Sequence, residues 1–156
     1  MNQYGFSPEE WNVLLSALLS ASIAISLVDA DGAMIEMMTL HDALDTRRAT
    51  YPAASAIGAL LQEAISSDAV DFLHTLEDLP FETLHRRTLS DLKRAVAILE
   101  NRQDPETTSV YKLIVYGIAV QIARSHEEGA LSDLTLEPIS AEEQALLDEY
   151  KHILDL

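Results

Sequence analysis

Three acid–histidine pairs in the chain have a spacing that can bring both side chains to one metal ion. The pairs are Asp71/His74, Glu82/His85 and Glu149/His152. Residues three apart share one face of an α-helix, and helical-bundle oxidases hold two iron or manganese ions with glutamate–histidine pairs of this kind. One hypothesis is therefore a di-metal oxidase that uses Glu82, His85, Glu149 and His152. The alternative is that these are ordinary surface pairs, which arise easily in an acidic chain.

A second candidate site is the acidic corner that follows the first apolar run. Asp29, Asp31 and Glu36 lie within a few residues of Gly32. Hard divalent cations prefer clustered carboxylate oxygens, and a cation here would also offset the negative end of the helix dipole. The spacing of an EF-hand loop is missing. The alternative is that these carboxylates are solvated groups at a helix end.

The composition narrows the classes of partner and chemistry. The 156 residues are 48% hydrophobic and include no cysteine, which excludes disulfides, thiolate metal sites and cysteine nucleophiles. The formal charge is −16, from 26 acidic and 10 basic residues, so a phosphate backbone would be repelled and we expect no nucleic-acid partner. The acidic excess suits a divalent cation or a basic protein partner. The missing cysteines fit a reducing compartment, and we expect a cytoplasmic protein.

The uncharged run Trp11–Val28 is long enough to raise the question of a membrane span. Glu9 and Glu10 flank it on one side and Asp29 on the other, and no basic residue precedes Arg47. Signal peptides and membrane anchors carry positive flanks, so we expect a buried core helix and no membrane partner.

The rest of the pattern is helical, without the alternation that marks strands, and no phosphate loop or nucleophile elbow is present. We therefore predict an all-α fold, with residues 1–156 as a single-domain multi-helix bundle. Ser7-Pro8-Glu9-Glu10 and Ser140-Ala141-Glu142-Glu143 read as capping boxes that open the first and last helices. Between them we expect helices over 33–46, over Thr50–Ser66, from Asp68, after Pro80, over Thr88–Arg102 and over Pro105–Arg124.

The two ends of the chain repeat one pattern, an apolar helix followed by an acidic corner that contains glycine. The first copy is Ala24–Gly32, and the second runs from Gly117 through His126-Glu127-Glu128-Gly129 to Ile139-Ser140-Ala141-Glu142-Glu143. This pattern resembles the repeat of the tellurite-resistance TerB-like domains, in which a helix that ends near Ala-x-x-Asp-Gly is followed by an Ile/Val-Ser-x-Glu-Glu helix start. The opening Phe6–Trp11 is similar to bacterial proteins with paired units of this type. The resemblance covers about residues 6–46 and 110–156.

The resemblance implies a role in metal-ion binding and stress resistance through acidic residues at the corners. On this chain the implied ligands of a divalent cation are Asp29, Asp31, Glu36, Glu127, Glu128, Glu142 and Glu143. The first copy lacks the Ser-x-Glu-Glu element after Gly32, and the second has His126-Glu127-Glu128-Gly129 in place of Asp-Gly, so the ligand set would be partial. The leading hypothesis is a non-enzymatic, metal-responsive or interaction module.

The paired units also predict a pseudo-symmetric bundle. We expect Trp11–Val28 and Ser109–Arg124 to be the two central helices, packed against each other through Ala24 and Gly117-Ile118-Ala119, because small residues allow close backbone approach. The segment Val110–Ala123 is apolar on more than one face. If one of these faces stays exposed, we expect a two-fold homodimer, and a structural self-associating scaffold is the third hypothesis.

Overall fold

A computed structural model describes residues 1–28, 33–102, 104–128 and 139–156, with side chains described outside 33–37 and 126–128. The described residues form seven α-helices and no strand, which confirms the all-α prediction. In order they are α1 (Pro8–Leu27), α2 (Ala33–Thr50), α3 (Ala56–Ala64), α4 (Ser67–Glu77), α5 (Phe81–Asn101), α6 (Pro105–Glu128) and α7 (Ala141–Leu154). Buried side chains from all seven helices form one hydrophobic core.

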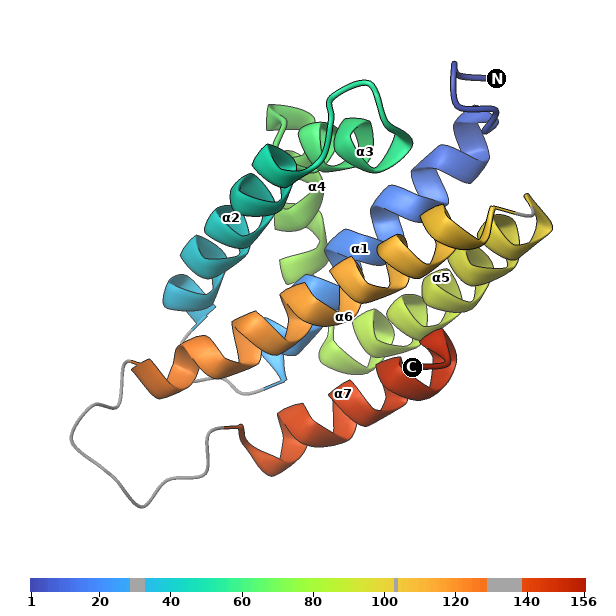
Figure 1. Ribbon diagram of the computed structural model, residues 1–156. Helices are drawn as coiled ribbons and strands as arrows, with labels where there is room; N and C mark the ends of the chain where they lie inside the picture. Colours follow the sequence, from blue (N-terminus) through green and yellow to red (C-terminus); the bar gives the residue numbers. More distant parts are fainter. Residues whose placement is uncertain (29–32, 103, 129–138) are drawn as a thin grey trace.

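Helix α1 is the central element of the bundle. It contacts each of the other six helices, and in Figure 1 it passes behind α6. Its sequence alternates leucine and isoleucine with alanine and serine, and nearly every residue from Val13 to Ser26 is buried. In the described part of the chain it is the one helix long and apolar enough to cross a membrane, and 67% of that apolar window is buried inside the protein. The expected core helix is thus present.

Serine caps set several helix starts. Ser7 accepts a hydrogen bond from the Glu10 amide at 3.1 Å, and Glu10 accepts one from the Ser7 amide at 2.8 Å, which completes the predicted capping box of α1. The third and fourth helices begin differently from the prediction. Thr50 is the last residue of α2, and α3 begins after Ser55, whose hydroxyl accepts from the Gly58 amide at 3.0 Å. Ser66 rather than Asp68 caps α4.

The two predicted central helices do pack against each other, but the other helices cover only α1 and leave one side of α6 open. Helix α6 packs on α1 as expected, but its outward side stays exposed, and the Leu113 side chain is 59% exposed. Gly117 is not a point of close approach to α1. A Cβ atom built there would meet the Arg47 Nη2 atom of α2 at 3.1 Å, and no α1 atom lies within 4 Å of it. The pseudo-symmetry stays a prediction, since both corners include residues outside the described part.

Candidate functional site

The residues of the implied divalent-cation site are described only in part. Asp29 and Asp31 lie outside the described residues, and the side chains of Glu36, Glu127 and Glu128 are not described. Glu142 is exposed, whereas Glu143 is fully buried and its carboxylate accepts a hydrogen bond from the Ser140 hydroxyl at 3.0 Å. Among the described side chains no group of three acidic or histidine residues is placed to hold a metal ion. The cation site therefore stays a prediction.

The acid–histidine pairs come together only in part. His85 on α5 lies 3.1 Å and 3.2 Å from the two Glu149 oxygens on α7, and its ring stacks on Phe81. Glu82 and His152 are exposed. A di-metal oxidase needs all four side chains to converge on one buried point. They do not, so this hypothesis is corrected: the His85–Glu149 pair joins α7 to α5.

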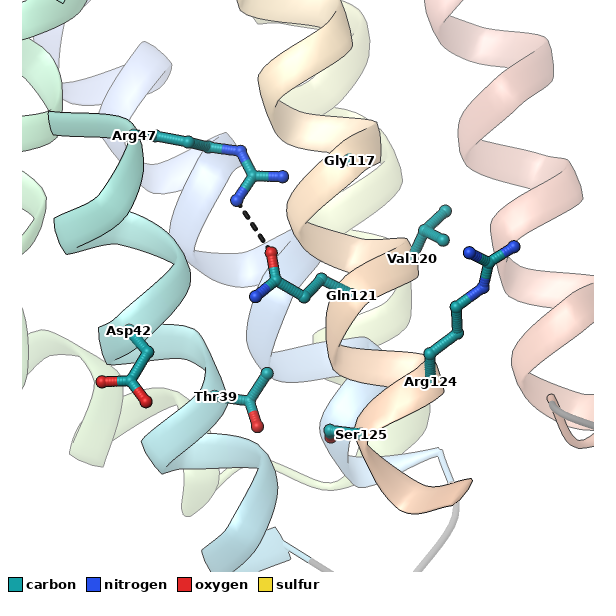
Figure 2. A pocket seen from close by; sticks show the side chains of 8 residues that line it. All are labelled: Thr39, Asp42, Arg47, Gly117, Val120, Gln121, Arg124 and Ser125. Atoms are coloured by element: carbon teal, nitrogen blue, oxygen red, sulfur yellow. Dashed lines mark hydrogen bonds between the residues drawn. The ribbon is translucent and has the colours of Figure 1, made fainter. Parts of the chain in front are cut away.

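A groove of about 440 Å³ lies between α2 and α6. Every third or fourth residue of the last half of α6 lines it, and α2 supplies the opposite wall. The lining residues are Thr39, Asp42, Arg47, Gly117, Val120, Gln121, Arg124 and Ser125. Figure 2 shows Arg47 and Gln121 meeting on one side of α6, while Val120 and Arg124 extend from its other side. We call this hollow the α2–α6 groove.

Arg47 closes the α2–α6 groove at one end. Its Nη1 atom donates to the Gln121 Oε1 atom at 2.9 Å and to the Ala43 carbonyl oxygen at 3.3 Å. Burial lowers the pKa of Arg47, because the charged guanidinium loses water, and the charge of the nearby Tyr51 acts in the opposite direction. Figure 2 shows the Asp42 carboxylate turned away from this guanidinium. Arg47 is thus a half-buried cation that is held by neutral oxygens.

Half of the ten lysine and arginine residues form ion pairs with described carboxylates, and Arg47 and Arg124 belong to the other half. Five other cations form ion pairs within 4 Å, namely Arg48, Arg87, Arg94, Arg102 and Lys112. Arg47 and Arg124 form none with the described carboxylates, although both line the α2–α6 groove. The carboxylate of a binding partner could therefore pair with either of two guanidinium groups, which flank α6.

The outward face of α6 is apolar in its middle. Leu113 is 59% exposed, and Val110, Tyr116 and Val120 are half-buried around it. Gly117 lies between them without a side chain, beside the end of Arg47. The face therefore presents one projecting leucine and one hollow, with cations at its edge. The sequence predicted the apolar character of α6, but it placed Gly117 against α1, whereas the structure places it beside Arg47 of α2.

A second hollow, of about 450 Å³, lies between α1, α4 and α5. Next to it the Ser16 hydroxyl donates to Asp91 at 2.7 Å, and Asp91 also lies 3.7 Å from Arg87 and 3.8 Å from Arg94. The Arg87 guanidinium stacks on the Phe72 ring at 5.3 Å. A nucleophilic serine needs an adjacent base, usually histidine. The contacts of Asp91 are ion pairs instead, and the network fastens α5 to α1 and α4.

Comparison with known proteins finds no matching family model, no matching curated protein and no matching solved structure. The resemblance to TerB-like domains therefore stays a prediction.

Proposed function

We propose that this chain is a non-enzymatic helical interaction module that binds a protein partner along the outward face of α6. The observation that carries the proposal is Leu113, a large apolar side chain 59% exposed on a helix whose other faces are packed. Val110, Tyr116 and Val120 continue the apolar surface around it. Contiguous exposed apolar surface that is edged by charge is typical of a protein-binding site.

The charges beside this face indicate the chemistry of the partner. Arg47 and Arg124 lack carboxylate partners among the described residues, and Arg47 is half-buried. A partner helix with an apolar stripe and a carboxylate at its end would bury Leu113 and pair with a guanidinium. The rest of the surface carries most of the −16 charge and repels other carboxylates. The acidic group of the partner therefore has to bind close to these two arginines.

The metal-responsive role that the TerB-like resemblance implies is a separate part of the proposal, as is a cytoplasmic location. Calorimetric titration with calcium, magnesium and zinc tests the metal role directly. If no cation binds more tightly than about millimolar, the weak end of the known calcium sites, the metal role is rejected and the interaction module is unaffected.

Photo-crosslinking in living cells tests the interaction module. A benzoylphenylalanine in place of Leu113 should yield a defined protein adduct, which mass spectrometry identifies. The matched control replaces Val70 on α4, which is also a large apolar residue exposed on a helix, at 42%. We expect an adduct at 113 and none at 70. The absence of an adduct at 113, or the same adducts at both positions, would contradict the proposal.

A further inference from the structure

The outward face of α6 follows a heptad pattern over two and a half repeats. Residues that alternate four and three apart form one stripe along a helix, as the a and d positions of a coiled coil do. On α6 the stripe contains Glu106, Val110, Leu113, Gly117, Val120 and Arg124. Each of these residues is exposed or half-buried in the structure. The stripe thus has the spacing of a coiled-coil seam, with apolar side chains at Val110, Leu113 and Val120 and charged residues at its two ends.

Two copies of the stripe are complementary when the two helices pack antiparallel. In an antiparallel pair of identical helices, residue numbers that face each other add to a constant, and here that constant is 230. Leu113 then faces Gly117, and Val110 faces Val120. At the ends, Glu106 faces Arg124, across a helix segment of about 27 Å at 1.5 Å per residue. Every a position meets a d position, as antiparallel packing requires.

We propose that the partner at this face is a second copy of the chain, bound through α6 about a two-fold axis near Val115. This inference rests on the proposed function, because it identifies the partner of the same face. The exposed apolar side chain of the helix, Leu113, then lies over Gly117 of the other copy, where no side chain projects from α6 and the end of Arg47 is the neighbouring group. The two-fold axis repeats this contact, so one operation forms it in both copies.

The charges at the two ends of the stripe favour a second copy, whereas the net charge of −16 on each copy opposes association. Arg124 has no carboxylate partner among the described residues, and the exposed Glu106 forms no ion pair there either. The symmetric pair supplies each with its counter-charge. A single pair of helices buries less surface than a standard interface of about 800 Å² per partner, so we expect a weak dimer that depends on concentration.

Exchange of the charges at the two ends of the stripe tests the dimer. Glu106→Arg places a cation opposite Arg124, and Arg124→Glu places a carboxylate opposite Glu106. We expect each variant alone to raise the dimer dissociation constant at least about tenfold. An equimolar mixture of the two variants should recover dimers, because each copy then meets the opposite charge. Lys93→Glu on α5 is the matched control for Arg124→Glu, since it makes the same charge change at an exposed position outside the stripe, and Glu82→Arg on α5 is the matched control for Glu106→Arg.

Sedimentation equilibrium at about 0.15 M salt, where charge repulsion between copies is screened beyond about 8 Å, measures these constants. Melting curves of each variant confirm that it is folded. A wild-type chain that stays monomeric up to about 1 mM overturns the inference, and so does a mixture that associates no better than either variant. If photo-crosslinking at 113 captures a different protein while the pure chain stays monomeric, the interaction module stands and the second copy is wrong.

Discussion

The Tyr111 hydroxyl on α6 donates a hydrogen bond to the Leu14 carbonyl oxygen inside α1 at 2.6 Å. Tyr150 on α7 makes the equivalent bond to the Ala21 carbonyl oxygen at 2.8 Å, two turns further along α1. Both tyrosines are fully buried, which raises their pKa far above the usual range because a buried phenolate would lose its hydration. They therefore fasten two helices to the central one as neutral donors.

Removal of either hydroxyl should destabilise the fold without disturbing its shape. We expect Tyr111→Phe and Tyr150→Phe each to lower the free energy of unfolding by about 0.5–1.5 kcal/mol, the usual net contribution of a buried hydrogen bond. Tyr116→Phe is the control, because the Tyr116 ring is half-buried on the outward face of α6. Urea melts of the three variants measure the difference. Equal losses at all three positions would show that the two buried hydroxyls contribute nothing specific.

Two glycines should respond in opposite ways to the same substitution. At Gly58 a Cβ atom would lie 2.0 Å from the Pro52 carbonyl oxygen, a backbone atom that cannot move freely. We expect Gly58→Ala to cost about 1–3 kcal/mol or more through overpacking.

At Gly117 the nearest atom is the end of the flexible Arg47 side chain, at 3.1 Å. Since alanine favours a helix over glycine by about 1 kcal/mol, Gly117→Ala should leave the monomer equally or more stable. The sequence-based prediction had instead placed Gly117 at a close approach to α1, where an added side chain would overpack. A loss above about 1 kcal/mol at dilute concentration would restore that interpretation.

The pH dependence of stability should involve Glu10. Its carboxylate accepts hydrogen bonds from the Ser7 backbone amide and from the Arg102 guanidinium, and its pKa is lowered, mainly by the Ser7 amide. A group with a lowered pKa in the folded state stabilises the fold at a pH above its unfolded value, about 4.3, and that contribution is lost as the pH falls through the folded value.

We therefore expect the stability of the wild-type chain to fall more steeply below about pH 4.3 than that of Glu10→Gln, as followed by thermal melts between neutral pH and about pH 3. Glu9→Gln, at the exposed neighbouring position, should keep the wild-type slope. The same slope in all three chains would mean that Glu10 has no special part in acid unfolding.

Helix starts could be predicted from the sequence where a capping residue or a proline determines them. Ser7 and Ser140 are caps that fix a helix start within a few residues, and Pro105 opens α6 as expected. The starts of α3 and α4 were predicted at the wrong residues, because more than one residue near each start can cap a helix: Ser55 rather than Thr50 precedes α3, and Ser66 rather than Asp68 precedes α4.

The neighbour of each helix face could not be predicted. The apolar run of α6 contains enough leucine, isoleucine and valine for two buried faces. The sequence of the helix alone does not determine which of the two faces the other helices cover. The structure buries the side with Tyr111, Val115 and Ile122 and leaves Leu113 outside. The stripe that includes Glu106, Leu113 and Arg124 is present in the sequence. It indicates a helix partner only once the structure shows that these residues face outward.

Disulfide trapping between two single-cysteine variants tests the central claim most directly, because the chain contains no cysteine of its own. Leu113→Cys and Gly117→Cys should form a mixed disulfide when the two variants are oxidised together, since facing residues of an antiparallel pair bring their Cα atoms within the roughly 4.4–6.8 Å that a disulfide spans. We expect the mixed dimer to exceed the dimer that either variant forms alone. Equal yields in all three samples, or no mixed dimer at all, would contradict the account.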